Sequence, residues 1–358
     1  MSPRRPGQAR RLRIRAPRPG WMRWFALWLL AFYSTWLALV LGGGHGATLA
    51  DHWGIALAMA AGSYVAGSTP MGGGSVGFPI LVLLFDQPAA LGRDFAFAIQ
   101  SIGMTSASIF ILCSGRPVEW RMLRFAMAGS LLATPPALAF LAPRVDDLAV
   151  KLVFSVAWAS FGLMHFVRLR ELCAASGITR MPAAFDRWAG LGVGVVGGAF
   201  IASLTGVGID LLLYVVLVLI SRADLKIAIP TSVMVMAFTS LVGISSLALL
   251  SRADPGTWSL SPALFGHWLA AAPVVAVGAP IGVFVVQRIG RKPTLLVVSI
   301  LCAAQFVWTL WHERSGLGAA GLGLALGGVL LCSAAFHAMY AIGKRAASRR
   351  GHRERPPP

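Results

Sequence analysis

Eight apolar runs, each long enough to span a lipid bilayer, constrain the fold of this chain more than any other feature of its sequence. Of its 358 residues, 57% are hydrophobic and only 12% are charged, which lies outside the balance of a soluble globular protein. In lipid, such runs satisfy their backbone polar groups by forming helices. The sequence therefore predicts an all-α polytopic integral membrane protein, with apolar runs at 24–41, 95–113, 122–142, 149–168, 227–250, 263–287, 294–311 and 317–341.

Two further apolar segments, 53–86 and 188–220, are too long for one straight crossing and too interrupted for two. The first contains a cluster of helix breakers from Gly67 to Pro79, in which glycines free the backbone for turns and two prolines remove amide donors. We therefore expect two half-helices around an irregular loop. At membrane depth such a loop survives only where it lines a cavity or is buried in protein, so it is the first candidate for a binding site.

The chain carries 31 basic and 13 acidic residues, and many of the basic ones lie in its two tails. Basic tails fit the positive-inside rule and are attracted to the anionic headgroups of a lipid bilayer. Both termini are therefore expected in the cytoplasm, and the protein in the cell inner membrane. Nucleic-acid binding is not expected, since no soluble domain remains to carry a basic face.

The basic residues in the loops test whether the two broken elements cross the membrane or turn back. If both are re-entrant, the cytoplasmic loops hold 12 basic residues and the outer loops hold five. If both cross, the corresponding numbers are eight and nine. Because orientation follows this bias, the sequence favours two re-entrant elements.

Several other classes of protein are disfavoured. The four cysteines are scattered and form no disulfide or metal-binding pattern. No ATP-binding loop of the G-x-x-x-x-G-K-S/T type is present, which argues against a primary pump. The run at 24–41 lacks a convincing cleavage site and is interpreted as a retained helix. No cofactor, metal or catalytic residue is expected, and the sequence specifies no oligomeric state.

The broken elements belong to an internal repeat. Pro70 to Gly72 matches Gly206 to Gly208, and Ile99 to Ser101 matches Pro230 to Ser232. The separation of matched residues drifts from 136 to 131 and later to 138 and 144, as insertions between diverged copies would produce. Each half would hold one re-entrant element and three crossings, and this odd number inverts the second half, a plan that recurs in secondary transporters. The expected organisation is a basic tail at 1–23, an extra helix at 24–41, a first repeat at 53–168, a linker at 169–187, a second repeat at 188–311, an extra helix at 317–341 and a basic tail at 342–358.

At these residues the sequence resembles the TauE/SafE family of sulfite exporters and related organosulfur-anion permeases. The family pattern is G-x-G-G-G, four residues and a proline, with a helix start of the A-x-x-T-S type downstream. Gly72 to Gly74 with Pro79 reproduces the glycine-to-proline spacing, and Ala228 to Ser232 matches the second helix start. The resemblance covers about residues 53–311 and implies a transporter of sulfite, a sulfonate or a related organosulfur anion.

The sequence also departs from the family pattern. Pro70 replaces the first glycine, and the second glycine run is reduced to Gly206-Val207-Gly208, followed by Asp210. Val215 stands where the second proline is expected. These departures leave room for another small anion or another mode of coupling.

An anion carrier needs half-helix N-termini and unpaired amides that face its ligand, since these offer positive potential without a buried cation. The two glycine loops, and nearby side chains that donate hydrogen bonds, supply such groups. Two other interpretations stand beside this one: glycines also permit tight helix packing, and serine or threonine often bonds its own helix. The candidate substrate-binding residues are Gly72, Gly73, Gly74, Ser75, Gly77, Gln100, Ser101, Gly206, Gly208, Thr231 and Ser232.

Asp210 is the one acidic residue that the repeat places at the centre of a broken element. An intramembrane carboxylate is a functional hypothesis by default, and its ability to take up a proton makes Asp210 the candidate coupling residue. The alternative is that it caps the following half-helix by accepting hydrogen bonds from the first amides. His165, His267 and His337 are interpreted as packed or interfacial residues.

Together these observations predict a secondary transporter that works by alternating access and is driven by an ion gradient or the membrane potential. A channel, in which the same loops form a selectivity filter, is the alternative. An intramembrane enzyme is a third interpretation. It needs a catalytic pair at membrane depth, such as serine with histidine or two carboxylates, and one of the three histidines within hydrogen-bond reach of Asp210 would favour it.

Overall fold

The fold is a bundle of helices, with no strand among the residues that the structure describes. The computed structural model describes residues 20–175, 177–285 and 291–353. Within these ranges nine helices are long and apolar enough to cross a membrane, so the predicted all-α polytopic fold is confirmed. Most of the predicted basic tail at 1–23, the end of the tail at 342–358 and the end of the run at 263–287 lie outside the described residues.

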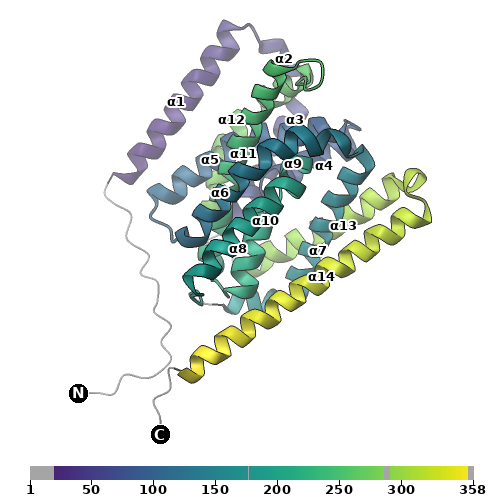
Figure 1. The fold of residues 1–358 in the computed structure, drawn as a ribbon. Helices are drawn as coiled ribbons and strands as arrows, with labels where there is room; N and C mark the ends of the chain where they lie inside the picture. Colours follow the sequence, from purple (N-terminus) through teal and green to yellow (C-terminus); the bar gives the residue numbers. More distant parts are fainter. Residues whose placement is uncertain (1–19, 176, 286–290, 354–358) are drawn as a thin grey trace.

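The chain forms its helices in two successive series, flanked by α1 and α2 at one end and by α14 at the other (Figure 1). The first elements are α1 (Trp21–Gly42), α2 (Gly46–Asp51), α3 (Trp53–Ser68), α4 (Gly74–Pro79) with the π-helical η1 (Ile80–Leu84), α5 (Ala89–Cys113), α6 (Trp120–Pro136) with η2 (Ala137–Leu141) and η3 (Ala142–Arg144), and α7 (Asp147–Ala174). The second series is α8 (Ala183–Val196) with η4 (Gly197–Ala202) and α9 (Ser203–Thr205), α10 (Ile209–Val215) with η5 (Val216–Ile220), α11 (Leu225–Ala253), α12 (Pro262–Val285), α13 (Arg291–His312) and α14 (Arg314–Arg353).

Eight of the nine long helices coincide with the apolar runs expected from the sequence, and the ninth does not. This ninth helix, Ala183–Thr205, is the first arm of the second broken element. The sequence predicts that this segment starts at residue 188 and is interrupted by its glycines. In the structure the helix begins after Pro182, and the π-helical η4 carries it through Gly197 and Gly198 without a break.

Both broken elements contain a half-helix that starts after an irregular loop. The half-helices are Gly74–Leu84 and Ile209–Ile220. At the rise of an α-helix they are about 16 and 18 Å long, which is roughly half of a hydrocarbon core about 30 Å thick. A half-helix whose far end reaches the membrane surface therefore begins near the middle of the bilayer. The re-entrant path itself remains a prediction.

The same local structure recurs in the two broken elements at a constant separation of 136 residues. It relates the two π-helical segments, Ile80–Leu84 and Val216–Ile220, and the next helix starts, Ala89 and Leu225. It also relates Asp86 and Arg222, the two non-glycine residues with positive φ in the described chain. This recurrence supports the predicted repeat, whereas the inversion of its second half remains a prediction.

The helix starts correct one detail of the predicted repeat. Because α5 and α11 begin 136 residues apart, Asp94 occupies the place equivalent to Pro230. The separation of 131 residues suggested by Gln100 and Thr231 came from a short match, and it does not hold within these helices. Gln100 consequently lies more than one turn deeper in α5 than Thr231 lies in α11.

Helices of the two series pack against each other in a reciprocal way. The first arm of each broken element packs on a helix of the other series: α3 lies on α12, and α8 lies on α6. The equivalent helices pair directly, α5 with α11 and α7 with α13. Such an arrangement is what two copies related by a two-fold axis would give.

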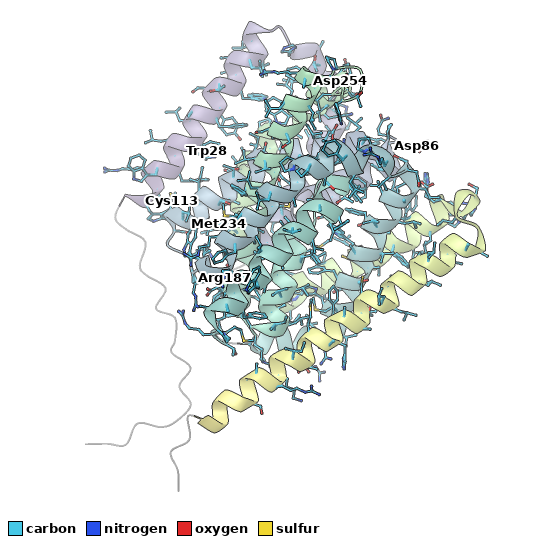
Figure 2. All side chains as sticks on the ribbon, viewed as in Figure 1. Trp28, Asp86, Cys113, Arg187, Met234 and Asp254 are labelled. Atoms are coloured by element: carbon cyan, nitrogen blue, oxygen red, sulfur yellow. The ribbon has the colours of Figure 1, made fainter. Side chains whose placement is uncertain are left out.

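The first and last helices lie at the edge of this bundle (Figure 1). In an apolar stretch of 18 residues within each helix, only 6% of the stretch is buried in α1 and only 11% in α14. Helix α1 is nevertheless attached to the bundle, because Trp28 lies on its inner side (Figure 2) and its indole donates to Ser106 Oγ at 3.1 Å. Tyr33 donates to the carbonyl of Pro273 at 2.6 Å.

Glycines bring the backbones of α3 and α12 into direct contact. A Cβ atom at Gly67 would overlap the carbonyl oxygen of Ala279, and one at Gly282 would overlap that of Tyr64. Small residues allow this close approach, which supplies packing energy between helices in lipid, where the hydrophobic effect does not. The first arm of the first broken element is therefore held against the second series of helices.

Substituting Gly67 tests this contact. Gly67→Ala should destabilise the protein by about 1–3 kcal/mol through overpacking against backbone atoms that cannot move aside. Gly54→Ala on the same helix is the matched control, because no atom lies within 4 Å of its Cβ position. Thermal unfolding of the purified protein in detergent is the measurement. Equal melting temperatures for the two variants would contradict the close packing of α3 on α12.

Candidate functional site

The first break is the irregular segment 69–73 between α3 and α4, and the second break is the segment 206–208 between α9 and α10. The side chain of Gln100 connects α5 to the second break. Its Nε2 atom donates to the carbonyl of Ala96 at 3.0 Å and to the carbonyl of Gly206 at 2.9 Å. Carbonyl oxygens only accept hydrogen bonds, so these two contacts fix which end of the amide carries the nitrogen. The Oε1 atom of Gln100 consequently points away from Gly206, and it is buried without a partner.

The first break meets both Gln100 and Asp210 at Gly72. Gly72 has a φ of 65°, a conformation that favours glycine. A Cβ atom there would overlap Gln100 Oε1 and would lie 2.9 Å from Asp210 Oδ2. Both side-chain oxygens therefore border the same small space, which only a residue without a side chain leaves free.

The two breaks also touch each other directly. A Cβ atom at Gly74 would overlap the side chain of Val207 and would lie 2.7 Å from Gln100 Nε2. Gly206, with a φ of 75°, packs so closely on α5 that a Cβ atom would overlap the carbonyl oxygen of Arg93. The irregular backbone of both broken elements is thus covered by protein, as a loop at membrane depth requires.

Asp210 caps the second half-helix with one of its two oxygens. Oδ1 accepts from the backbone amides of Gly208 at 3.1 Å and of Leu211 at 3.0 Å. The residue is fully buried, and Oδ2 has no hydrogen-bond partner. The capping role considered from the sequence therefore accounts for Oδ1, whereas Oδ2 lies next to Gly72 without a hydrogen-bond partner.

The starts of the two half-helices differ in charge. The first turn of a helix leaves amide groups without intrahelical acceptors and carries partial positive charge. At α10 the carboxylate of Asp210 already occupies this position. At α4 no side chain caps the first turn. An external anion would meet less competition at the first break than at the second.

The candidate hydroxyl groups donate within their own segments. Ser75 Oγ donates to Gly72 O at 2.7 Å and thereby stabilises the first break. The other three hydroxyls bond carbonyls of their own helices: Ser101 to Ala98, Ser232 to Ile229 and Thr231 to Ile227.

The structure does not bring all of the candidate residues together. Thr231 Oγ1 also accepts from the amide of Glu119, at the start of α6, which lies away from the contact of the two breaks. Gly77 packs against Met59 and the ring of Phe95. The contacts at the breaks thus involve Gly72, Gly74, Gln100, Gly206 and Asp210, and a substrate-binding role for every candidate residue remains a prediction.

A small cavity lies beside the first break. Gly73 and Gln100 line it together with residues of α3, α5 and α12, among them Met59, Ser63 and Val275. Its open volume is about 10 Å³, roughly room for one water molecule. A sulfite ion does not fit this cavity unless the surrounding helices separate.

Trp158 is a neighbour of the site that the sequence analysis did not select. Its ring is fully buried, stacks on Phe154 at a centroid distance of 4.2 Å and lies 3.2 Å from the Cβ position of Gly208. Its indole Nε1 is buried without a partner. The sequence signal is its place in the middle of the apolar run at 149–168.

The histidines do not form a catalytic pair with Asp210. His165 Nδ1 lies 2.9 Å from the carbonyl of Phe161, so it carries the proton, and Nε2 bonds the hydroxyl of Tyr214 at 2.9 Å. His337 contacts Arg168, and the ring of His267 packs against that of His52. Among the described residues the hydrogen bonds of Asp210 come from backbone amides, and none of these three histidines bonds its carboxylate.

Comparison with known proteins yields one family. The sequence model of the sulfite exporter TauE/SafE family matches residues 54–309. No significant match was found among curated proteins or solved structures. The matched range runs from α3 to α13 and includes both breaks, Gln100 and Asp210. Since it spans well over half of the sequence and all of the elements that build the site, the chain belongs to the TauE/SafE family of sulfite exporters.

Proposed function

We propose that this protein is a secondary transporter that moves a small anion, sulfite or a sulfonate, across the cell inner membrane by alternating access. The observation that carries the proposal is the contact of two broken helices through Gln100, in a chain of the sulfite exporter family. Broken helices that meet near the midplane are a recurring way to build a transporter binding site. The basic residues at both ends support cytoplasmic termini.

The first break is the proposed place of anion contact. Its half-helix has no side-chain cap, so the amides of Gly73, Gly74 and Ser75 can donate to an oxyanion. Gly73 also lines the small cavity beside the first break. Glycine at positions 73 and 74 lets the ligand approach the backbone closely, which a side chain would prevent.

Alternating access is supported by the closed state of the cavity and by the packing of the helices. An opening of about 10 Å³ accommodates no oxyanion, so binding requires α3, α5 and α12 to separate. The reciprocal pairs, α3 with α12 and α8 with α6, give the two series equivalent surfaces on which to move. Rocking of one repeat against the other would then expose the site to each side in turn.

Asp210 is the proposed coupling residue. It is a fully buried carboxylate at the second break, and its free oxygen faces the glycine of the first. A change in its charge therefore acts on both breaks at once. Buried acidic residues at such positions typically form part of ion or proton pathways.

Counterflow of labelled sulfite tests the transporter proposal. Proteoliposomes loaded with unlabelled sulfite should accumulate labelled sulfite transiently, and uptake should saturate, because a carrier exchanges its ligand through a single alternating site. Sulfate, thiosulfate, sulfoacetate and chloride serve as competitors to define the substrate class, and protein-free liposomes are the control. Unsaturable flux with single-channel currents would contradict the carrier and indicate a channel.

Replacing Gly72 tests the role of the first break. Gly72→Ala should abolish sulfite counterflow, because the new Cβ overlaps Gln100 and approaches Asp210. Gly44→Ala is the matched control: Gly44 has a similar φ of 67°, but no atom lies within 4 Å of its Cβ position. Both variants carry a backbone strain of roughly 1–2 kcal/mol, and only the first disturbs the site. Equal counterflow in the two variants, at equal yield of folded protein, would contradict the proposal.

A further inference from the structure

We propose that Asp210 and Gln100 together form a proton-binding site, in which the proton sits on Asp210 Oδ2 and Gln100 Oε1 accepts its hydrogen bond. The role of this site in coupling rests on the proposed function, whereas the site itself does not. It identifies the coupling ion as a proton and adds Gln100 as the residue that positions it.

The orientation of Gln100 is the first step of the argument. If its amide were flipped, Oε1 would face the carbonyls of Ala96 and Gly206, and three acceptors would point at one another without a hydrogen. The hydrogen bonds of Nε2 to these carbonyls therefore lock the amide. As a consequence, Oε1 must face the space beside Gly72.

The second step concerns what can occupy that space. Gln100 is 1% exposed and Asp210 is not exposed at all, and each has one unpartnered oxygen close to the Cβ position of Gly72. Two facing acceptors in an environment of low dielectric repel each other, and an unpaired buried carboxylate oxygen is strongly unfavourable. A proton on Oδ2 removes the charge and turns the repulsion into a hydrogen bond.

A metal cation fits the geometry less well. It would need several oxygen ligands in addition to these two. The described residues contain no group of three or more His, Cys, Asp or Glu side chains that could hold a metal ion. The proton is the one cation that two oxygens suffice to bind.

Among the residues that the structure describes, no charged side chain forms an ion pair with Asp210. In the described part of the chain its carboxylate contacts the amides of Gly208 and Leu211. Arg93 and Asp94 of α5 pair with each other at 2.8 Å, and Tyr214 of α10 bonds His165 of α7. Other charged side chains on the surrounding elements have partners elsewhere: Lys151 of α7 pairs with Asp147 and Glu313. On α8, Asp186 pairs with Arg121 and Arg187 stacks on Trp188. On α11, Lys226 and Arg252 lie near the two ends of the helix.

The proton transfer is balanced and simple. Asp210 takes a proton from water on one side of the membrane and releases it to water on the other, and the O–H bond at Oδ2 is the only bond formed or broken. While the proton is bound, Asp210 carries no negative charge to repel an anion at the nearby first break. The loaded carrier therefore holds the anion and the proton together, and the empty one holds neither.

Infrared difference spectroscopy of the full-length protein in proteoliposomes, between acidic and alkaline pH, tests the site without reference to transport. Wild type should show the carbonyl band of a protonated carboxyl group at acidic pH, and Asp210→Asn should lack it. Asp254→Asn is the matched control, since Asp254 also accepts from backbone amides, of Gly256 and Thr257, but lies in an exposed loop (Figure 2). In Gln100→Met the band should move to higher frequency, because its hydrogen bond is lost. A difference spectrum in which Asp210→Asn equals wild type would overturn the proposal.

Sulfite accumulation under an imposed pH gradient separates failure of this site from failure of the proposed function. One pH unit should raise the accumulation ratio of wild type about tenfold over that of Asp210→Asn at the same pH values, since tenfold corresponds to one coupled proton. Accumulation that follows a sodium gradient, with no dependence on the pH gradient and no carboxyl band, would overturn the proton site and leave the transporter intact. A carboxyl band that depends on Asp210, in a protein that moves no anion, would support the site and refute the transport function.

Discussion

Irregular backbone in the middle of a membrane must have its polar groups covered, and the architecture of this protein depends on how that requirement is met. The carbonyl of Gly206 is covered by the amide of Gln100, and the amides of Gly208 and Leu211 are covered by the carboxylate of Asp210. Neither partner could be replaced by an apolar residue without leaving a buried polar group unsatisfied. The second break therefore requires a side chain with a hydrogen-bond donor near the centre of α5, which Gln100 supplies.

The same requirement explains why the two breaks, which share one local structure, differ in chemistry. At the constant separation of 136 residues, Gly74 in the first element stands where Asp210 stands in the second. The first half-helix begins at buried glycines without a side-chain cap, and the second begins with its own carboxylate. The two proposed sites, one for an anion and one for a proton, would then differ through a single glycine-to-aspartate difference between two related segments.

Much of the fold could be predicted from the sequence, because lipid makes the spacing of apolar residues and helix breakers decisive. The half-helices and the repeat of Gly72 at Gly208 followed from glycine and proline positions. The ninth long helix was missed, because a π-helical segment absorbed the glycines at 197 and 198. The match of Gln100 with Thr231 departs from the separation of 136 residues between the helix starts, since a three-residue match with one identical residue cannot specify a helix register.

The candidate site was predictable only in part. The glycine loops and Asp210 were identifiable because breakers and carboxylates are rare in apolar helices. Which polar side chains contact the breaks depends on the rotation and depth of each helix, and a sequence pattern does not contain these quantities. Gln100 reaches the second break from about three turns inside α5, whereas Ser101, its neighbour, bonds its own helix. Trp158 enters through a stack of aromatic rings from α7.

The most direct test of this account is the position of bound sulfite in an experimental map of the protein prepared with saturating sulfite. The account predicts density for the anion at the first break, within hydrogen-bond distance of the amides of Gly73 and Gly74 and next to Gln100. Density at a site remote from both breaks, with Gly72 still packed against Gln100 and Asp210, would contradict it.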